Sequence, residues 1–317
     1  ILQKIIKDKE LRLWFAGLIV IAANAGGAWS PIGDVTTTML WIANKVTPLQ
    51  LINHVLLPSI ACYALPSLIA SRMKIFKGQI DSDLTEEPTA SKYSATMFYL
   101  GLAGILFVPI FKTLTHLPPY VGMMLSLAIV SAVAEFLSNK QFSVAAATSG
   151  HGVHEPQHSP VHKSLSKIEM PSILFFLGIL MAVAALESLG MLYEFAGVLE
   201  KGVPMLGTEH GTTTLSDLVV LLLGAGSAVI DNVPLVAASI GMFSMQLDAP
   251  EWHFIAYSAG TGGSILVIGS AAGVVAMGME KIDFFWYLKK IGGLALLGFL
   301  AGGAVFIILR DFLLNAH

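Results

Sequence analysis

Long runs of apolar residues constrain the fold of this chain more than any other feature. Most of them can cross the hydrocarbon core of a bilayer as a helix, which takes about 20 residues. Only 12% of the residues are charged, whereas a soluble domain carries about 25%. The sequence therefore predicts an all-α membrane protein. We expect a flexible cytoplasmic loop at residues 138–170 and apolar spans at residues 12–44, 49–70, 95–111, 119–137, 171–190, 215–245, 254–280 and 283–309.

Three of these spans are interrupted by residues that do not suit a helix in lipid. The interruptions fall at residues 24–34, at the Asp231-Asn232-Val-Pro234 stretch and at residues 260–273. Backbone groups that a broken helix frees are costly in hydrocarbon and are tolerated only where protein or a water-filled cavity satisfies them. The pattern therefore predicts discontinuous transmembrane helices around a polar site, as in secondary transporters.

The Lys and Arg positions indicate how span 215–245 meets the membrane, because basic residues gather on the cytoplasmic side. If this segment enters and returns on the same side, 14 of the 18 basic residues lie on one side of the membrane. If it crosses fully, the split falls to 11 against 7. The count favours a re-entrant hairpin with Asp231 near its tip and both ends outside. The outer side then holds four basic residues, Lys45, Lys112, Lys201 and Arg310.

An internal repeat links the first and last interruptions. ANAGGAWSPIGD (23–34) aligns without gaps with AGTGGSILVIGS (259–270), with five identities, and Asp34 falls opposite Ser270. By the charge count, the two copies enter the membrane from opposite sides. Inverted repeats with broken, Gly-rich helices are typical of the binding site of a transporter.

The repeat divides the chain into two parts. We assign residues 1–94 to the latter part of a first inverted repeat, whose beginning we expect upstream of Ile1. Residues 95–317 form the second inverted repeat in this interpretation.

Oxygen-bearing side chains gather at the first interruption, namely Asn24, Ser30, Asp34, Thr36 and Thr37. The first half-helix ends there with free carbonyls, whose partial negative charge suits a cation. Hard cations such as Na⁺ prefer oxygen ligands. The pattern therefore predicts a cation site. The alternative is that Asp34 only caps the second half-helix.

Asp231 and Asn232 form the second candidate group. An ionisable residue inside a membrane segment is a candidate functional residue. Removal from water raises the pKa of a carboxyl group, so an aspartate here is predicted to exchange a proton. The alternative is that Asp231 only ties the hairpin tip together. The last broken helix adds Thr261, Ser264 and Ser270 as uncharged ligands, although its Gly and Ser content also suits close helix packing.

Three stretches carry a family resemblance: NAGGAWSPIGDVTTT (24–38), SAVIDNVPLVAASIGMF (227–243) and AGTGGSILVIGSAAGVVAMGM (259–279). They resemble the NhaD-type sodium/proton antiporters of the ion transporter superfamily, which also holds arsenite pumps and dicarboxylate carriers. The resemblance runs along essentially the whole chain. It implies two inverted repeats, each with a re-entrant hairpin and a discontinuous helix, in a homodimer whose transport domains move like an elevator against a scaffold.

The resemblance also implies a cation site. Carried onto this sequence, the site includes serines of the last broken helix together with Asn24, Asp34, Thr36, Thr37, Asp231 and Asn232. One departure is that the first repeat's own hairpin is absent from this sequence, and we expect it upstream of Ile1.

These features favour a transporter that exchanges Na⁺ or Li⁺ for H⁺ by alternating access, with cation and proton competing for buried Asp and with no cofactor. An anion carrier for a dicarboxylate or arsenite is the alternative, but Asp34 and Asp231 do not suit an anion. An intramembrane hydrolase with an aspartyl dyad leaves the repeat unexplained, and a structural scaffold does not need buried Asp.

The protein is therefore not expected to be an enzyme. We expect a multi-pass homodimer in the lipid bilayer of a bacterial inner membrane. No basic tract or nucleic-acid motif is present in the sequence, so no nucleic acid is expected as a partner.

Overall fold

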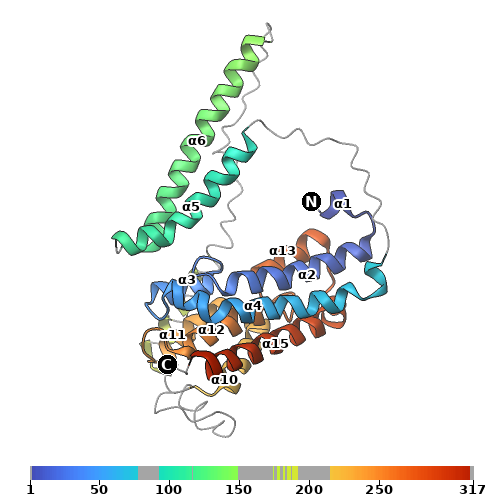
Figure 1. Ribbon diagram of the computed structural model, residues 1–317, viewed down its shortest axis with the longest axis vertical. Coiled ribbons are helices and arrows are strands. Elements are labelled where there is room, and N and C mark those ends of the chain that lie inside the picture. The colour runs from blue at the N-terminus through green and yellow to red at the C-terminus, as the bar shows by residue number, and fades with distance from the viewer. Residues whose placement is uncertain are drawn as a thin grey trace. The chain divides into compact units, whose positions relative to one another are not determined.

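The helices of this protein are seen in a computed structural model (Figure 1). All regular elements that it describes are helical. The described residues are 2–77, 93–115, 117–148 and 215–314, with scattered positions between 174 and 191.

The chain divides into two compact units. Unit 1 consists of residues 1–85 and 178–317, and unit 2 of residues 86–177. Unit 1 contains all three interruptions and combines residues from both predicted repeats. The inverted repeat itself stays a prediction.

Five helices among the described residues are long and apolar enough to cross a membrane. They agree with the expected spans, and the chain is a multi-pass integral membrane protein. The expected span at 171–190 lies largely outside the described residues. The five helices are α2 (Lys9–Ala28), α4 (Pro48–Ser71), α5 (Ser94–Thr115), the first part of α6 (Pro119–Leu137) and the C-terminal stretch Phe284–Phe312.

Unit 2 contains α5 and α6 (Pro119–Thr148), which pack as an antiparallel pair. Ser126 of α6 donates a hydrogen bond to the carbonyl oxygen of Gly104 in α5 at 2.9 Å. Because α6 continues to Thr148, the first part of the expected loop at 138–170 is helical, and that part of the prediction is wrong. Ala, Lys and Gln in this stretch favour a helix without any apolar periodicity. Residues 149–170 lie outside the described residues.

In unit 1, α4 packs tightly against α15 (Gly293–Leu309), and Figure 1 shows α2, α4 and α15 side by side. Gly298 of α15 lies against the Cys62 carbonyl, and Gly302 lies against the Pro58 carbonyl. Small residues four apart let two membrane helices approach closely. Residue numbers rise along one helix as they fall along the other, so the two helices are antiparallel.

Short elements flank these long helices. Before α15, α14 (Phe284–Tyr287) runs into the π-helical stretch η2 (Leu288–Gly292). The others are α1 (Leu2–Ile5), η1 (Lys74–Phe76) and the π-helical η3 (Arg310–Leu314).

All three predicted interruptions are breaks between helices. Six residues separate α2 from α3 (Val35–Ile42). Residues 263–270 separate α12 (Pro250–Gly262) from α13 (Ala271–Glu280). A single residue, Asp231, separates α10 (Asp217–Ile230) from α11 (Asn232–Met242).

The first break begins later than the sequence predicted. Asn24, Gly26 and Gly27 belong to α2, which ends only at Ala28. Asn and Gly weaken a helix by at most about 1 kcal/mol each relative to Ala. Buried neighbours on α2, among them Ile21 and Ala25, outweigh that penalty by packing against the rest of unit 1.

Contacts between distant residues place both ends of segment 215–245 at the same end of unit 1. Asp217, the first residue of α10, forms a bidentate ion pair with Arg310 after α15, with N–O distances of 2.6 and 2.8 Å. Asp248, which follows α11, accepts hydrogen bonds from the backbone N–H (2.6 Å) and hydroxyl (2.8 Å) of Thr47. Because α4 and α15 are antiparallel, Thr47 and Arg310 lie at one end of the helix pair.

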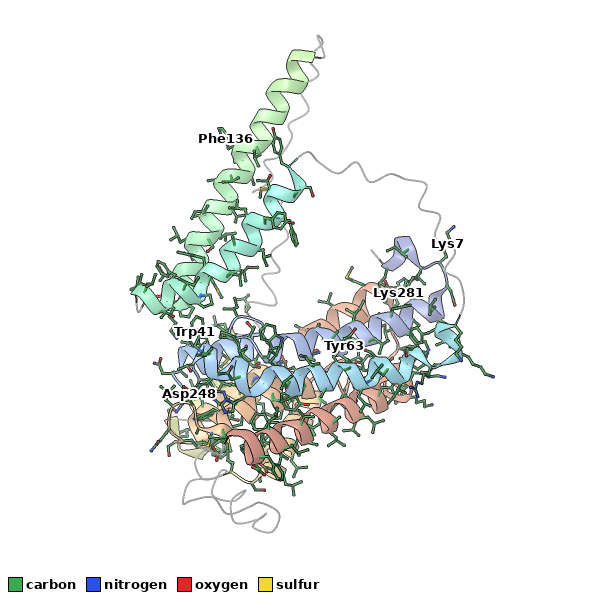
Figure 2. The ribbon with its side chains drawn as sticks, viewed as in Figure 1. Lys7, Trp41, Tyr63, Phe136, Asp248 and Lys281 are labelled. Carbon is green, nitrogen blue, oxygen red and sulfur yellow. The ribbon has the colours of Figure 1, made fainter. Side chains whose placement is uncertain are left out.

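The opposite end of unit 1 carries other charged residues. Figure 2 shows Lys7 and Lys281 at that end and Trp41 and Asp248 at the first. An ion pair of 2.6 Å between Arg12 and Glu280 joins the beginning of α2 to the end of α13 there.

Candidate functional site

The loop between α2 and α3 closes on itself through glycine backbones. A Cβ added to Gly33 would lie 2.5 Å from the Gly27 carbonyl oxygen. Asp34 then caps α3 by accepting a hydrogen bond of 2.8 Å from the first backbone N–H of that helix. The Thr37 hydroxyl donates to the Ser30 carbonyl oxygen at 2.7 Å. These bonds satisfy backbone groups that the break frees, which explains how a break can occur in an apolar span.

The break between α12 and α13 has the same glycine contact. Gly263 lies against the Gly269 carbonyl as Gly27 lies against the Gly33 carbonyl. The sequence alignment pairs these positions.

The N-caps of the second half-helices also correspond. Asp34 (φ −145°, ψ 158°) caps α3, and Ser270 (φ −154°, ψ 154°) caps α13. Asp34 therefore caps α3, which both the cation-site prediction and its alternative allow. Its carboxylate has further contacts that a cap does not need.

The glycine contact makes a prediction about stability. Gly33→Ala places a methyl group against the Gly27 carbonyl, so the loop must open. Overpacking of this kind costs about 1–3 kcal/mol. Thermal unfolding in detergent should show a lower Tm than for the unsubstituted protein. Gly26→Ala is the matched control, because a Cβ there meets no atom within 4 Å. Equal Tm values for the two variants would contradict the tight closure.

Asp231 turns the chain between α10 and α11 without any intervening loop. Its φ of 78° lies in the left-handed region, where a non-glycine residue is strained by about 1–3 kcal/mol. Its carboxylate accepts a 2.7 Å hydrogen bond from the Asn232 backbone N–H and so caps α11. Such strain tends to gather at functional sites.

Two asparagine side chains join half-helices that are far apart in the sequence. The Asn232 amide donates to the Asp34 carboxylate at 2.9 Å, which links α11 to the N-terminus of α3. The Asn24 amide donates to the Ser270 hydroxyl at 3.0 Å, which links α2 to the N-terminus of α13. In both bonds an asparagine N–H meets the residue that caps another half-helix, and the amide oxygen is left as an acceptor.

The Asp34 carboxylate is the centre of the first of these groups. Besides the α3 N–H and Asn232, it accepts a 2.6 Å hydrogen bond from the Thr36 hydroxyl. It is also close enough to the Asp231 carboxylate for the two charges to interact. The structure therefore brings Asp34, Thr36, Asp231 and Asn232 together, although the hydrogen-bonded residues Asp34 and Asn232 are 198 positions apart in the sequence.

The remaining predicted residues are placed differently. Thr37 is buried and holds the loop rather than contacting a carboxylate. Thr261 and Ser264 are buried and donate to backbone carbonyls of α12, at 2.7 Å each. Asn24 and Ser270 form the second joined pair.

Sequence reasoning missed Ser227. This fully buried serine of α10 donates to the Gly224 carbonyl (2.6 Å) and the Ala259 carbonyl (3.1 Å), and so ties α10 to α12. It precedes Asp231 by four residues, about one helical turn before the break at the end of α10. That spacing was a usable signal in the sequence.

The arrangement concentrates oxygen atoms and negative charge. Breaks in α2–α3, α10–α11 and α12–α13 bring helix ends into one region, where C-terminal carbonyls carry partial negative charge. Among the described residues of unit 1, Arg12 and Arg310 form ion pairs away from this region, with Glu280 and Asp217 respectively. Such a region suits a hard cation or a proton.

Comparison with known proteins gives consistent results. Residues 1–253 match the citrate transporter (CitMHS) family. The chain is 40% identical over 316 residues to sodium/proton antiporter 1 of Arabidopsis thaliana, covering 98% of this chain and 51% of that protein. It is 37% identical over 322 residues to sodium/proton antiporter 2 of the same plant, covering 98% of this chain and 71% of that protein.

Bacterial relatives show the same pattern. The Na⁺/H⁺ antiporter NhaD of Vibrio cholerae is 35% identical over 285 residues, covering 86% of this chain and 56% of that protein. The chain thus spans between about half and about 70% of the length of these relatives. No solved structure matches.

Proposed function

This chain belongs to the citrate transporter (CitMHS) family, and from that premise we propose that it exchanges Na⁺ or Li⁺ for H⁺ across a membrane. The observation that carries the proposal is the Asp34–Asn232 hydrogen bond, which holds two carboxylates from different broken helices near each other. The relatives are named as transporters and antiporters, not as enzymes, so an intramembrane hydrolase is not supported.

The cation ligands in this proposal are oxygen atoms around the two asparagine bridges. Asp34 and Asp231 supply the negative charge, and Asn24, Asn232 and Thr36 supply neutral oxygen atoms. Thr37, Thr261, Ser264 and Ser270 complete the predicted set. Hydroxyl and amide oxygens replace the water that Na⁺ loses on entering the site.

Coupling follows from the charge of the site. A bound cation favours ionised carboxylates, and a bound proton removes the charge that holds the cation. The two ions therefore exclude each other. If the binding site can move across the membrane with either ion bound, but moves poorly when it is empty and charged, the protein exchanges the two ions by alternating access.

A re-entrant hairpin at 215–245 is part of the proposal. The contacts of Asp217 with Arg310 and of Asp248 with Thr47 support it, because they put both ends of the segment at one end of unit 1. At 1.5 Å per residue, the 14 residues of α10 extend about 21 Å, which is less than the roughly 30 Å hydrocarbon core. Asp231 then lies within the membrane at the tip.

Cysteine labelling tests this topology. Leu215→Cys and Leu247→Cys, each in a background with Cys62→Ala, should react with an impermeant thiol reagent from the same side of the membrane. Lys281→Cys is the control and should react only from the opposite side. Labelling of positions 215 and 247 from opposite sides would show that the segment crosses fully.

Reconstitution into liposomes tests the function. An imposed Na⁺ or Li⁺ gradient should drive proton movement, followed with a lumenal pH dye, whereas K⁺, citrate and arsenite should not. The family name makes an anion carrier the second candidate, but the paired carboxylates disfavour it. Citrate or arsenite flux without cation-driven proton movement would overturn the proposal.

The assembly and location follow the same reasoning. We propose that the protein works as a homodimer in which a transport domain moves against a scaffold, as its resemblance to the antiporters implies. The bacterial inner membrane stays a prediction, because the similar proteins come from a plant as well as from bacteria.

A further inference from the structure

We propose that Tyr287 is a positioning residue for cation binding. It lies outside the site and fixes the orientation of a backbone carbonyl in the break between α12 and α13. The inference rests on the proposed cation exchange. Tyr287 is fully buried at the end of α14 and has no place in the ligand set described above.

Tyr287 holds a specific carbonyl group of the break. Its hydroxyl donates a 2.8 Å hydrogen bond to the carbonyl oxygen of Ser264. Ser264 directly follows Gly263, the C-cap of α12, where carbonyls have no partner within the helix. The bond therefore fixes the direction of a carbonyl at the negative end of a half-helix, next to the hydroxyl of a predicted ligand.

The segment after Tyr287 packs closely against the next carbonyl of the break, that of Ile265. A Cβ on Gly292, at the end of the π-helical stretch η2, would lie 3.0 Å from the Ile265 carbonyl oxygen. Ile291 of the same stretch fills the space above Gly17 of α2, where a Cβ would lie 2.5 Å from its side chain. Residues 287–292 thus pack between α2, the first half of one broken helix, and the break between α12 and α13. Single-turn π-helices occur frequently at functional sites.

These contacts of residues 287–292 have a consequence for transport. If Tyr287 loses its hydroxyl, the Ser264 peptide is free to rotate, and the oxygen atoms around it no longer point in one fixed direction. Cation affinity depends on such pre-arranged oxygen atoms, whereas the movement of the site across the membrane does not depend on this bond. Affinity should therefore change more than the maximal rate.

Tyr287→Phe tests the inference in liposomes. We expect the KM for Na⁺ to rise about three- to ten-fold, the effect of one lost hydrogen bond, with the maximal rate within about two-fold of the original. The ratio of Na⁺ to Li⁺ affinity should change as well, because the two ions differ in size.

Trp252→Phe is the control. Trp252 is also a fully buried aromatic residue, and its indole N–H donates to a backbone carbonyl, that of Met245, at 3.3 Å, which belongs neither to the break nor to the ligand set. Its KM for Na⁺ should stay unchanged even if its Tm falls.

The outcomes separate the two proposals. Absence of cation-driven proton movement in the unsubstituted protein would sink the proposed function. Normal exchange in that protein with equal KM values for Tyr287→Phe and Trp252→Phe would overturn the role of Tyr287 alone. A Tyr287→Phe protein that fails to fold would overturn it too, because the bond would then hold the fold rather than set the affinity.

Discussion

Asp231→Asn should abolish Na⁺/H⁺ exchange while the protein still folds. The substitution keeps the size of the side chain and an oxygen atom that can accept the 2.7 Å bond from the Asn232 N–H. Asn has nearly the same shape as Asp, so it should bear the same backbone strain at φ 78° and ψ 148° that Asp231 already bears. The capping of α11 and the sharp turn after α10 should both survive. What is lost is the negative charge and the group that takes up a proton.

We expect the exchange rate to fall at least about 100-fold. Without the Asp231 carboxylate, a cation that has left water for the site lacks its negative partner, and such a loss costs several kcal/mol. The measurement is cation-driven proton movement in liposomes, with the Tm and elution profile of the protein as checks on folding. Asp8→Asn is the matched control, because Asp8 is an exposed N-cap at the beginning of α2 that bonds the Glu10 N–H. An Asp231→Asn protein that exchanges Na⁺ for H⁺ at a normal rate would rule out the mechanism.

Asp34→Ser should have a similarly large effect, and it separates the two roles of Asp34. Ser270 shows that a serine with nearly the same backbone angles can cap the second half of a broken helix. The variant therefore keeps a capping hydroxyl for α3 but removes the carboxylate that Thr36 and Asn232 contact. We expect a folded protein whose exchange rate falls about 100-fold or more, because half of the negative charge at the site is gone.

A retained rate in Asp34→Ser would show that Asp34 is only a cap. The Na⁺ dependence gives a second readout, because a weakened site raises KM, whereas a loosened α3 lowers Tm. Thr38→Ser is a suitable control for disturbance of the same turn, since its hydroxyl bonds the Pro31 and Asp34 carbonyls and serine keeps that group.

The membrane class and the breaks could be predicted from the sequence because they depend on local composition. Runs of apolar residues and a low content of charged residues determine whether a segment lies in the lipid bilayer or in water. Gly, Pro and Asp decide where a helix in lipid can end. The pairing of Asp34 with Ser270 was also accessible, because two copies of one loop keep the same glycines for the same backbone contact. The extent of α6 was not, because helix formation there needs no apolar pattern.

The sequence by itself therefore determined which residues could form a site, and the tertiary structure decided which of them meet. The sequence around each residue does not show that Asn232 forms a hydrogen bond with Asp34. Nor does it show that Asn24, which lies inside a helix and not in a loop, forms one with Ser270. Those contacts arise from the packing of α3 on α11 and of α2 on α13. Helix packing depends on the shapes of many side chains at once, such as the glycines that let α10 and α12 approach. Local composition sets the position of a break along the chain, whereas the position of that break in space depends on the whole fold.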